Sequence, residues 1–448
     1  MTATRSALSR RQFIGLSGAT AAVTVVGGCA TNPVTGRRQL MFLSESAEIS
    51  MDKERAPHQF SADYGALQDA RLAQYVSEVG SKLAVKTHRP DMPYDFQSLN
   101  ASYVNAYTFP GGSMAVTRGI LLGMENEAEL AAVLGHELGH VNARHTAQRM
   151  TKGLLSQAIV AGVTMYIAEE HEKYASLAYG LGGIGAGALL ARYSRGNERE
   201  ADALGMEYMT QAGYSPQGMV GLMDMLNGLH KRKPDLLQRM FSSHPMSSER
   251  YADAMAAMNG KYNVARSLLL GRERYMDMTA GLRKIEGAIK LLQDGDLAMM
   301  KQKFDQALVA YTGALRIAPK DYAGLLSMAK CQMALGKKKE AQRFVERAQS
   351  VYPGEPHAVH VAGMVSLASR QFAAAHAAFA AYDKALPGNP STAFHDGTAL
   401  EGMGRKEDAA RRYAHYLRAT QQGKEARHAH QRLIDWGYIK PAPAGHAE

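Results

Sequence analysis

Cysteine is almost absent from this sequence, since its 448 residues include two, Cys29 and Cys331, which lie far apart in the chain. A disulfide framework is therefore excluded, and Cys331, in a helical stretch, is expected to be a packing residue. Aromatic residues make up 7%, with one tryptophan, and the net charge of +10 comes from Lys and Arg spread along the chain. We therefore predict no nucleic-acid partner. The remaining composition, 46% hydrophobic and 21% charged, is typical of a globular protein of two or three domains.

Long apolar runs are also lacking, and the run near the N-terminus, Ile14–Val26, is too short for a relaxed bilayer span. It follows a segment that resembles a twin-arginine export signal, Ser9–Ile14. Val, Gly and Gly precede Cys29 as in a bacterial lipobox, where the cysteine is lipidated after cleavage. We predict a signal peptide over 1–28 and a lipid on Cys29; an uncleaved anchor and a general secretory signal are the alternatives. Ala30, rather than Asp, follows the cysteine, which favours the outer membrane.

Two further apolar stretches, at 154–168 and 174–191, are separated by a charged segment. The first is short for a span, and the second contains five glycines, which weaken an isolated helix. We expect a helical hairpin that lies over the core or touches lipid rather than a true span. His145 and His171, on either side of the first stretch, are expected to be structural or solvated.

The C-terminal third carries a repeat of about 34 residues, in which small residues, large apolar residues and prolines recur in step. The recurring residues are Ala307, Ala341, Ala375 and Ala409; Tyr311, Val345, Phe379 and Tyr413; and Pro319, Pro353 and Pro387. The pattern is typical of tetratricopeptide repeats, helix pairs that stack into an all-α solenoid and bind partners on the concave face. We predict four units, near 288–321, 322–355, 356–389 and 390–423, and then a capping helix and flexible tail over 424–448.

A metal-binding motif lies in the middle of the chain, in a predicted helix that Asn126 can cap. The motif is His136-Glu137-Leu138-Gly139-His140, a match to H-E-x-x-H. The two His lie one turn apart on one face, so both imidazoles can bind one zinc ion. Glu137 lies at the edge of that face, where it can accept a proton from zinc-bound water. By itself the motif is also compatible with two buried His and a solvated Glu.

A third ligand decides between these alternatives. The position at which astacin- and collagenase-like enzymes carry their third His is Thr146, so that class is excluded. Glu198 and Asp202 share one face of a later helix. Glu198 can complete a His2Glu site with a fourth position for water, and Asp202 can accept a hydrogen bond from a ligand His. Glu200 points elsewhere and is expected to be a solvated charge.

His136–Val141 together with Glu198–Asp202 resembles the HtpX and CaaX-prenyl-protease peptidase family, and the lipobox and repeats narrow this to its secreted, BepA-like branch. Asn32–Gly36, Asn105–Tyr107 and Pro110–Gly112 add to the resemblance. It implies an α+β zincin fold of the gluzincin type, mostly helical, in which a small sheet with an antiparallel edge lies on helices and one zinc ion is bound per chain.

Domain limits follow from the motifs and the repeats. We expect a metalloprotease domain over 29–275 and a repeat domain over 276–423. Within the first, 94–105 and 113–121 are predicted to be strands joined by a turn. Asn105 and Ala106 are then candidates for an edge strand that holds extended substrate by main-chain hydrogen bonds; the alternative is an ordinary hairpin.

The resemblance also gives meaning to a His-Pro loop. His244 could donate a hydrogen bond to the oxyanion of the reaction, or bind zinc as a fourth ligand and block the site; an ordinary loop His is the third possibility. Arg250 could help to stabilise the oxyanion, although a surface salt bridge fits it equally well.

The function that follows is a zinc endopeptidase of the bacterial cell envelope, in the periplasm and lipid-anchored to the outer membrane. Zinc would lower the pKa of its water to roughly 7, and Glu137 would move the proton. The expected substrates are unfolded or misassembled envelope proteins, and the repeats are expected to contact the outer-membrane protein assembly machinery. The alternative is a chaperone-like assembly scaffold with latent proteolysis.

Overall fold

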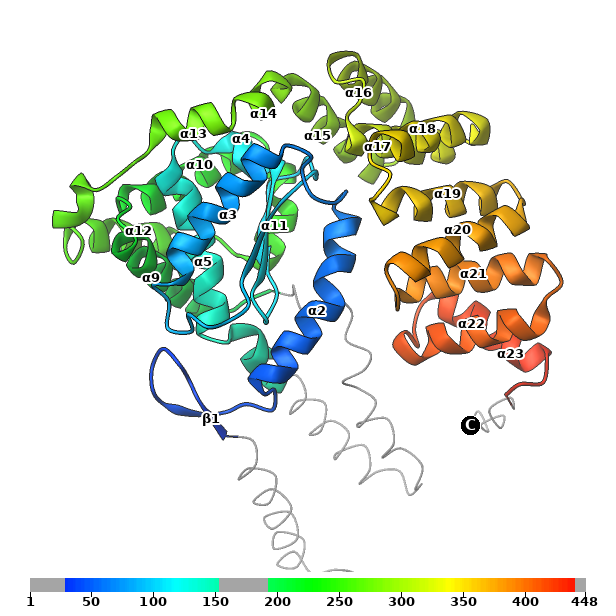
Figure 1. The fold of residues 1–448 in the computed structure, drawn as a ribbon, viewed down its shortest axis with the longest axis horizontal. Coiled ribbons are helices and arrows are strands. Elements are labelled where there is room, and N and C mark those ends of the chain that lie inside the picture. The colour runs from blue at the N-terminus through cyan, green and yellow to red at the C-terminus, as the bar shows by residue number, and fades with distance from the viewer. Residues whose placement is uncertain (1–28, 153–191, 440–448) are drawn as a thin grey trace, which may run out of the picture.

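The computed structural model describes residues 29–152 and 192–439 as helices arranged around a small sheet (Figure 1). The predicted export signal at 1–28, the apolar stretches with His171, and the end of the tail lie outside the described residues. In the part that is described, no helix combines the length and the apolar content needed to cross a membrane. The elements form a mixed N-terminal unit and an all-helical C-terminal unit.

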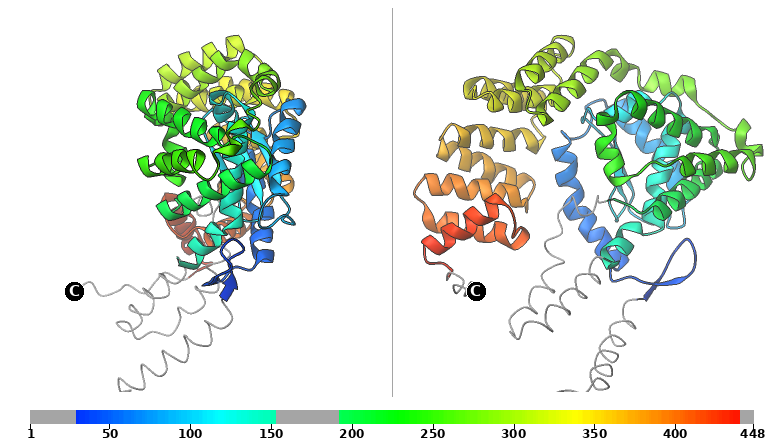
Figure 2. Two further views of the ribbon diagram at one scale, coloured as in Figure 1. Left: turned by 90° about the vertical axis from the view of Figure 1, so that its left-hand side faces the viewer. Right: turned by 180° about the vertical axis from the view of Figure 1, so that it is seen from behind.

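A short hairpin and a long helix open the described chain. β1 (Cys29–Thr31) and β2 (Arg38–Leu40) pair antiparallel, and α2 (Glu45–Ala62) follows. Ser44 caps α2, because its side chain accepts a hydrogen bond from the backbone N–H of Ala47 at 3.1 Å. Two views agree that α2 lies between the sheet and the C-terminal helices, so it connects the two units (Figures 1 and 2).

The small sheet has three strands, in the order β3 (Asp95–Leu99), β5 (Ser113–Thr117) and β4 (Ala106–Thr108). β4 and β5 pair antiparallel, so the sheet has the expected antiparallel edge. β3, which lies in the segment predicted to form a hairpin with 113–121, runs parallel to β5 instead. The expectation of one continuous strand over 94–105 is therefore wrong, since the segment is β3 followed by a loop. The edge strand itself begins at Ala106.

Specific contacts explain why the strands are shorter than expected. Asn100 Nδ2 donates to the backbone carbonyls of Tyr64 and Ala66 at 3.1 and 2.7 Å, which takes the chain out of the sheet after β3. The strand expected over 113–121 also ends early, because Thr117 caps α4 (Arg118–Gly123).

The central helices of the N-terminal unit are α3 (Ala70–Ala84), α5 (Glu127–Asn142) and α9 (Arg195–Gln211). α5 begins where the sequence predicts, since the side chain of Asn126 accepts a hydrogen bond from the backbone N–H of Glu129 at 3.0 Å. Every residue of α5 is buried, so this helix is the axis of the core. The amphipathic helix α3 and the strand β4 pack against it.

Glycines allow α5 and α9 to cross at very short range. A Cβ on Gly139 would lie 2.8 Å from the carbonyl oxygen of Ala201, and a Cβ on Gly205 would lie 2.7 Å from the backbone nitrogen of His136. Any larger residue would push the helices apart. This crossing places the first turns of α9 beside the two histidines of α5.

A series of helical elements completes the N-terminal unit and leads into the second. These are α10 (Gln217–Arg232), η1 (Pro234–Leu237), α11 (Gln238–Ser243), α12 (Ser248–Asn259), η2 (Val264–Ser267), α13 (Arg272–Met278) and α14 (Ala280–Lys284). α11 ends one residue before His244, which it directs toward α5 and α9.

Four consecutive helix pairs and one last helix form the C-terminal unit, which curves past α2 (Figure 2). The pairs are α15 (Glu286–Met300) with α16 (Phe304–Ile317), α17 (Tyr322–Ala334) with α18 (Lys338–Val351), α19 (Pro356–Ala368) with α20 (Phe372–Ala385), and α21 (Pro390–Gly402) with α22 (Lys406–Ala419). The last helix, α23 (Lys424–Asp435), packs on α22. The recurring alanines and aromatic residues are buried where the helices of a pair meet.

The first repeat is built into the N-terminal unit rather than attached to it. Ile289 of α15 is fully buried in the same core as α5. Gln293 donates to the backbone carbonyl of Ser102 at 2.8 Å, and Ser102 donates to Asp296 at 2.7 Å. The core of the N-terminal unit is therefore completed by residues beyond the predicted boundary at 276.

Candidate metal centre

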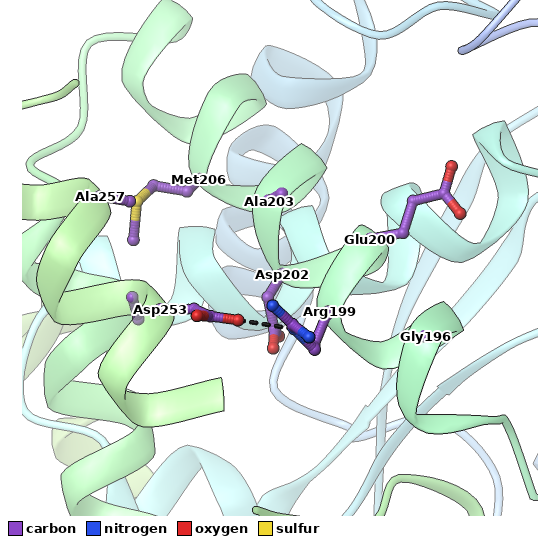
Figure 3. A pocket seen from close by; sticks show the side chains of 9 residues that line it. Gly196, Arg199, Glu200, Asp202, Ala203, Met206, Asp253 and Ala257 are labelled. Atoms are coloured by element: carbon purple, nitrogen blue, oxygen red, sulfur yellow. Dashed lines mark hydrogen bonds and ion pairs between the residues drawn. The ribbon is translucent and has the colours of Figure 1, made fainter. Parts of the chain in front are cut away.

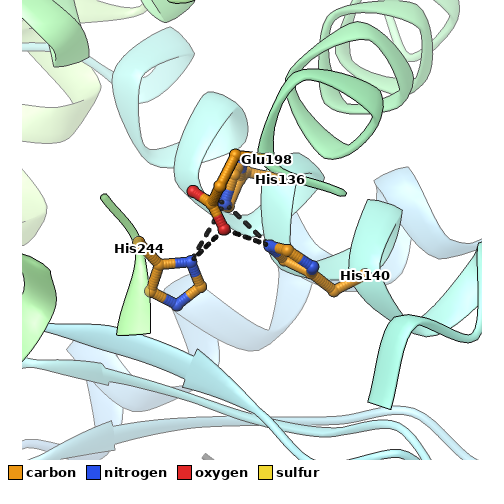
Figure 4. A group of neighbouring side chains, drawn as sticks. All are labelled: His136, His140, Glu198 and His244. Carbon is orange, nitrogen blue, oxygen red and sulfur yellow. Dashed lines mark hydrogen bonds and ion pairs between the residues drawn. The ribbon is translucent and has the colours of Figure 1, made fainter. Parts of the chain in front are cut away.

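Four buried side chains from three helical segments converge on one point (Figure 4). They are His136 and His140 of α5, Glu198 of α9, and His244 at the end of α11. One ligand atom from each lies within 4.8 Å of the others. The structure thus brings together the three predicted ligands and the His-Pro loop histidine.

The two histidines of α5 turn the same nitrogen toward the cluster. His140 Nε2 lies 3.1 Å from His136 Nε2 and 3.3 Å from Glu198 Oε1. Burial lowers the pKa of His140 well below its ordinary value, so its imidazole is neutral and offers a lone pair. Both features suit a metal ligand.

Glu198 lies in the first turn of α9, where the helix dipole favours a negative charge. Its Oε1 is 3.2 Å from His244 Nδ1, and its side chain is fully buried. Burial raises the pKa of this carboxyl, but His244 and His140 outweigh that effect and lower the pKa overall. Glu198 is therefore a buried carboxylate, which requires positive charge close by.

Glu137 lies beside this cluster, on the same helix α5 as the two histidines. Its Oε1 is 3.7 Å from His244 Nε2, and its Oε2 is buried without a hydrogen-bond partner among the residues that the structure describes. Burial raises the pKa of this carboxyl. An unpartnered buried oxygen is unusual in a folded protein and indicates that another group is to be bound there.

Asp202 and Arg250 form a second layer behind His136. Asp202 Oδ1 is 2.8 Å from His136 Nδ1, and Arg250 binds both oxygens of Asp202 at 2.6 and 2.7 Å. Arg250 Nη1 is also 2.7 Å from Glu198 Oε2. Arg250 is buried, which excludes the surface salt bridge that the sequence left open, and its donors are directed at carboxylates and at the Pro245 carbonyl.

Sequence reasoning missed three residues around His140. His145, predicted to be structural or solvated, is fully buried and contacts both His140 and Glu200, and Glu200, predicted to be a solvated charge, is partly exposed. The ring of Tyr193 stacks on the ring of His140 at a centroid distance of 3.8 Å. The only signal for Tyr193 is its position directly before Ser194, which caps α9.

The candidate substrate strand lies close to the metal helix. Ala106 begins β4, which packs on α5, and Asn105 precedes it. Both residues are buried, and in the described part of the chain the Oδ1 of Asn105 has no hydrogen-bond partner. The backbone of Asn105 pairs with Thr117, at the end of β5. β4 is the last strand of the described sheet, so its outer edge has no partner strand there.

The side chains present fit a divalent cation. The carboxyl groups of Glu137, Glu198 and Asp202 are buried together and outnumber the one fixed positive charge beside them, the guanidinium of Arg250. Isolated buried charge is strongly unfavourable, and a divalent ion would compensate it. Imidazole nitrogens with one carboxylate oxygen are the donor set of a His2Glu zinc site.

A separate pocket of about 470 Å³ lies between α9 and α12 (Figure 3). Arg199 and Asp253 form an ion pair of 2.6 Å across it, and Asp202 reaches its inner wall. None of the four clustered residues lines this pocket. We therefore assign the chemistry to the cluster and not to the pocket.

Two family profiles match the chain. That of peptidase family M48 matches residues 70–257, and that of the tetratricopeptide repeat matches residues 298–362. Both fall where the sequence places the protease and the repeats, so the predicted order of a metallopeptidase domain followed by a repeat region is confirmed.

Curated relatives include proteases. The chain is 28% identical over 228 residues to the beta-barrel assembly-enhancing protease of Yersinia pestis, covering 48% of this chain and 46% of that protein. It is 35% identical over 190 residues to the metalloprotease YcaL of Escherichia coli (strain K12), covering 42% of this chain and 68% of that protein. The match thus spans less than half of the assembly-enhancing protease.

Among solved structures, the tetratricopeptide repeat protein YrrB is similar over 46% of this chain and 97% of its own, with 15% identity and a TM-score of 0.30. A TM-score this low supports no conclusion about function.

Proposed function

Because the chain belongs to peptidase family M48, we propose that it is a zinc-dependent endopeptidase of the bacterial cell envelope. One observation carries the proposal: a buried His2Glu donor set lies beside Glu137, whose Oε2 has no hydrogen-bond partner within 29–152 and 192–439. The residues that would hold the ion are His136, His140 and Glu198. A bound zinc ion would polarise the scissile carbonyl and make water acidic enough to react near neutral pH.

The remaining chemistry belongs to the side chains. Glu137 takes a proton from the attacking water at its free oxygen and passes it to the leaving amine. Asp202 accepts a hydrogen bond from His136 Nδ1–H and so keeps the lone pair on His136 Nε2. Arg250 holds Asp202 and Glu198 in place and offsets part of their charge.

His244 acts as a latch on this centre. Its Nδ1 lies 3.2 Å from Glu198 Oε1 and 3.4 Å from His136 Nε2, so it occupies the fourth position of the donor set. A zinc site with four protein ligands is closed, whereas catalysis needs one position open. Movement of His244 would therefore precede hydrolysis.

The substrate and the location follow from the repeats and the N-terminus. We infer that the repeats deliver unfolded or misassembled envelope proteins and contact the machinery that assembles outer-membrane proteins, in line with the name of the Yersinia relative. An extended segment of such a protein would add to the outer edge of β4 at Ala106, beside Asn105, whose backbone groups are already paired with Thr117. Lipidation of Cys29 would anchor the protein in the periplasm.

A second candidate is an assembly scaffold whose proteolysis is latent. The closed set of four protein donors favours it, because a centre that holds its own fourth ligand does not cleave at rest. The repeats, which supply no catalytic group, would then perform the main duty.

The substitution Glu137→Gln tests the endopeptidase. Wild type and variant are each expected to hold one zinc ion, while casein hydrolysis by the variant falls by about 10²–10⁴-fold. Glu207→Gln is the matched control, since Glu207 lies on α9 and its side chain meets Gln211 at 3.3 Å and Lys261 at 3.6 Å, away from the cluster. Equal hydrolysis by wild type and Glu137→Gln would overturn the proposal. Full function of Glu137→Gln in the cell would instead favour the scaffold.

A further inference from the structure

His140 has an outer partner of its own, on the side away from the cluster. His140 Nδ1 lies 2.9 Å from His145 Nδ1, and His145 Nε2 lies 3.1 Å from Glu200 Oε2. His145 has no solvent exposure, and the side chain of Glu200 is 34% exposed. A buried chain of three groups therefore runs from His140 to the surface of α9.

An unusual backbone conformation produces this contact. α5 ends at Asn142, and Arg144 has a left-handed conformation with a φ of 56°, which is uncommon for a residue other than glycine. The side chain of Arg144 is held by Glu48 at 3.1 Å and by the backbone carbonyl of Leu43 at 2.7 Å. The turn brings His145 back against the helix that it has just left.

The hydrogen atoms of this chain follow from the role of His140. To bind a metal through Nε2, His140 must carry its proton on Nδ1. Nδ1 of His145 must then accept that hydrogen bond, so His145 carries its proton on Nε2 and donates it to Glu200. This role therefore requires one tautomer of each of the two histidines, and that pair of tautomers keeps the lone pair of His140 Nε2 directed at the cluster.

We propose that His145 and Glu200 are positioning residues that fix the tautomer and the ring orientation of His140. The proposal rests on the metalloprotease function, because the tautomer matters only if His140 binds a metal. The arrangement parallels that of His136, whose Nδ1 meets Asp202. The first two turns of α9 then provide three acidic residues with different roles. Glu198 is a ligand, Asp202 meets His136, and Glu200 meets His140 through His145.

The test measures zinc affinity of the full chain by competition with a chelator. His145→Phe keeps an aromatic ring but removes the acceptor, and zinc is expected to bind about 10–100-fold more weakly. His145→Asn places its Oδ1 at the position of the lost Nδ1, so it is expected to recover most of the affinity. Visible spectra of the cobalt-substituted proteins report the ligand geometry independently of catalysis.

Glu200→Gln provides a second test that does not disturb the core, because this side chain is partly exposed. It is expected to bind zinc more weakly than wild type, and adding it to His145→Phe should cause no further loss, because the two residues act in series. His88→Phe is the matched control, since His88 pairs with Tyr208 at 2.7 Å and not with the cluster.

The outcomes separate this proposal from the proposed function. If wild type holds zinc and His145→Phe holds it equally well, or if His145→Asn is as weak as His145→Phe, the positioning role is wrong and the metalloprotease stands. If wild type holds no zinc, both are wrong. Unfolding of the metal-free variants shows whether a loss of affinity comes from misfolding.

Discussion

Arg118 and Asp321 form a buried ion pair that joins the protease to its second repeat. Arg118 opens α4, directly after β5, and is 1% exposed, while Asp321 caps α17. Arg118 donates to both carboxylate oxygens, one of them at 3.0 Å. Burial raises the pKa of Asp321, but the adjacent guanidinium outweighs this and lowers the pKa overall.

Asp321→Asn should therefore destabilise the whole protein. It keeps the oxygen that caps α17 but leaves Arg118 buried without a counter-charge, so the free energy of unfolding is expected to fall by about 3–5 kcal/mol. Urea unfolding measures this loss. Asp294→Asn is the control, because Asp294 forms an exposed pair with Lys233 at 3.1 Å, worth at most about 1 kcal/mol. Equal effects of the two substitutions would contradict the buried junction.

The position of this ion pair determines which C-terminal truncations leave a protein that can fold. A chain ending at 287 would lose Ile289 from the protease core and Asp321 from its partner, and we expect it not to fold. A chain ending at 387 keeps α15 to α20, so it should cleave a short peptide as the full chain does. It should cleave a whole unfolded protein more slowly if the last repeats deliver substrate.

Measurements of kcat/KM with a peptide and with unfolded casein compare these chains. Glu137→Gln in the shortened chain is the control for contaminating protease. An equal loss of both activities in the chain ending at 387 would count against delivery by the last repeats.

Sequence patterns predict features that repeat or that follow helical spacing. The helix pairs begin where the 34-residue pattern of about four units places them, and the face of α5 follows from H-E-x-x-H. Arg118 and Asp321 could not be recognised in this way, because a charged residue in a sequence is normally read as exposed. Their burial depends on two segments that are distant in the chain.

Contacts made by individual side chains are also not predicted by sequence patterns. The strand expected over 94–105 breaks because the amide of Asn100 replaces sheet hydrogen bonds, which alternation of apolar residues does not reveal. His145 meets His140 only because Arg144 adopts a left-handed conformation. Such contacts depend on the folded backbone.

Another prediction concerns pH and the third repeat. Glu355, which caps α19, accepts a hydrogen bond from Ser61 of α2 at 2.5 Å. Burial raises the pKa of this carboxyl above its ordinary value of 4.5, so the folded protein favours the neutral form. The stability that it contributes is present below pH 4.5 and is lost as the pH rises through the raised pKa.

Glu355→Gln should therefore stabilise the protein at neutral pH and lose that advantage at acid pH. Unfolding of wild type and variant at each pH gives the difference between them, so any loss of metal at acid pH affects both. Glu346→Gln, on the exposed face of α18, is the control. A difference between Glu355→Gln and wild type that stays constant with pH would show that ionisation of Glu355 has no part in it.

The last prediction concerns the latch. If His244 closes the metal centre, only the small fraction of molecules with the latch open is active at rest. His244→Ala would make all of them open, and basal hydrolysis of a short peptide is expected to rise about 10-fold or more if the open state is populated at about 10% or less. The variant should also release zinc faster, because one of four donors is gone.

The alternative for His244 gives the opposite result. If His244 donates a hydrogen bond to the oxyanion, the alanine variant loses transition-state stabilisation and kcat falls while zinc affinity stays the same. His230→Ala is the control, because His230 is exposed on α10 and makes an edge-to-face contact with Phe241, three residues before His244, and is not part of the cluster. Peptide hydrolysis and zinc release, measured on the same preparations, therefore distinguish a histidine that restrains the enzyme from one that assists it.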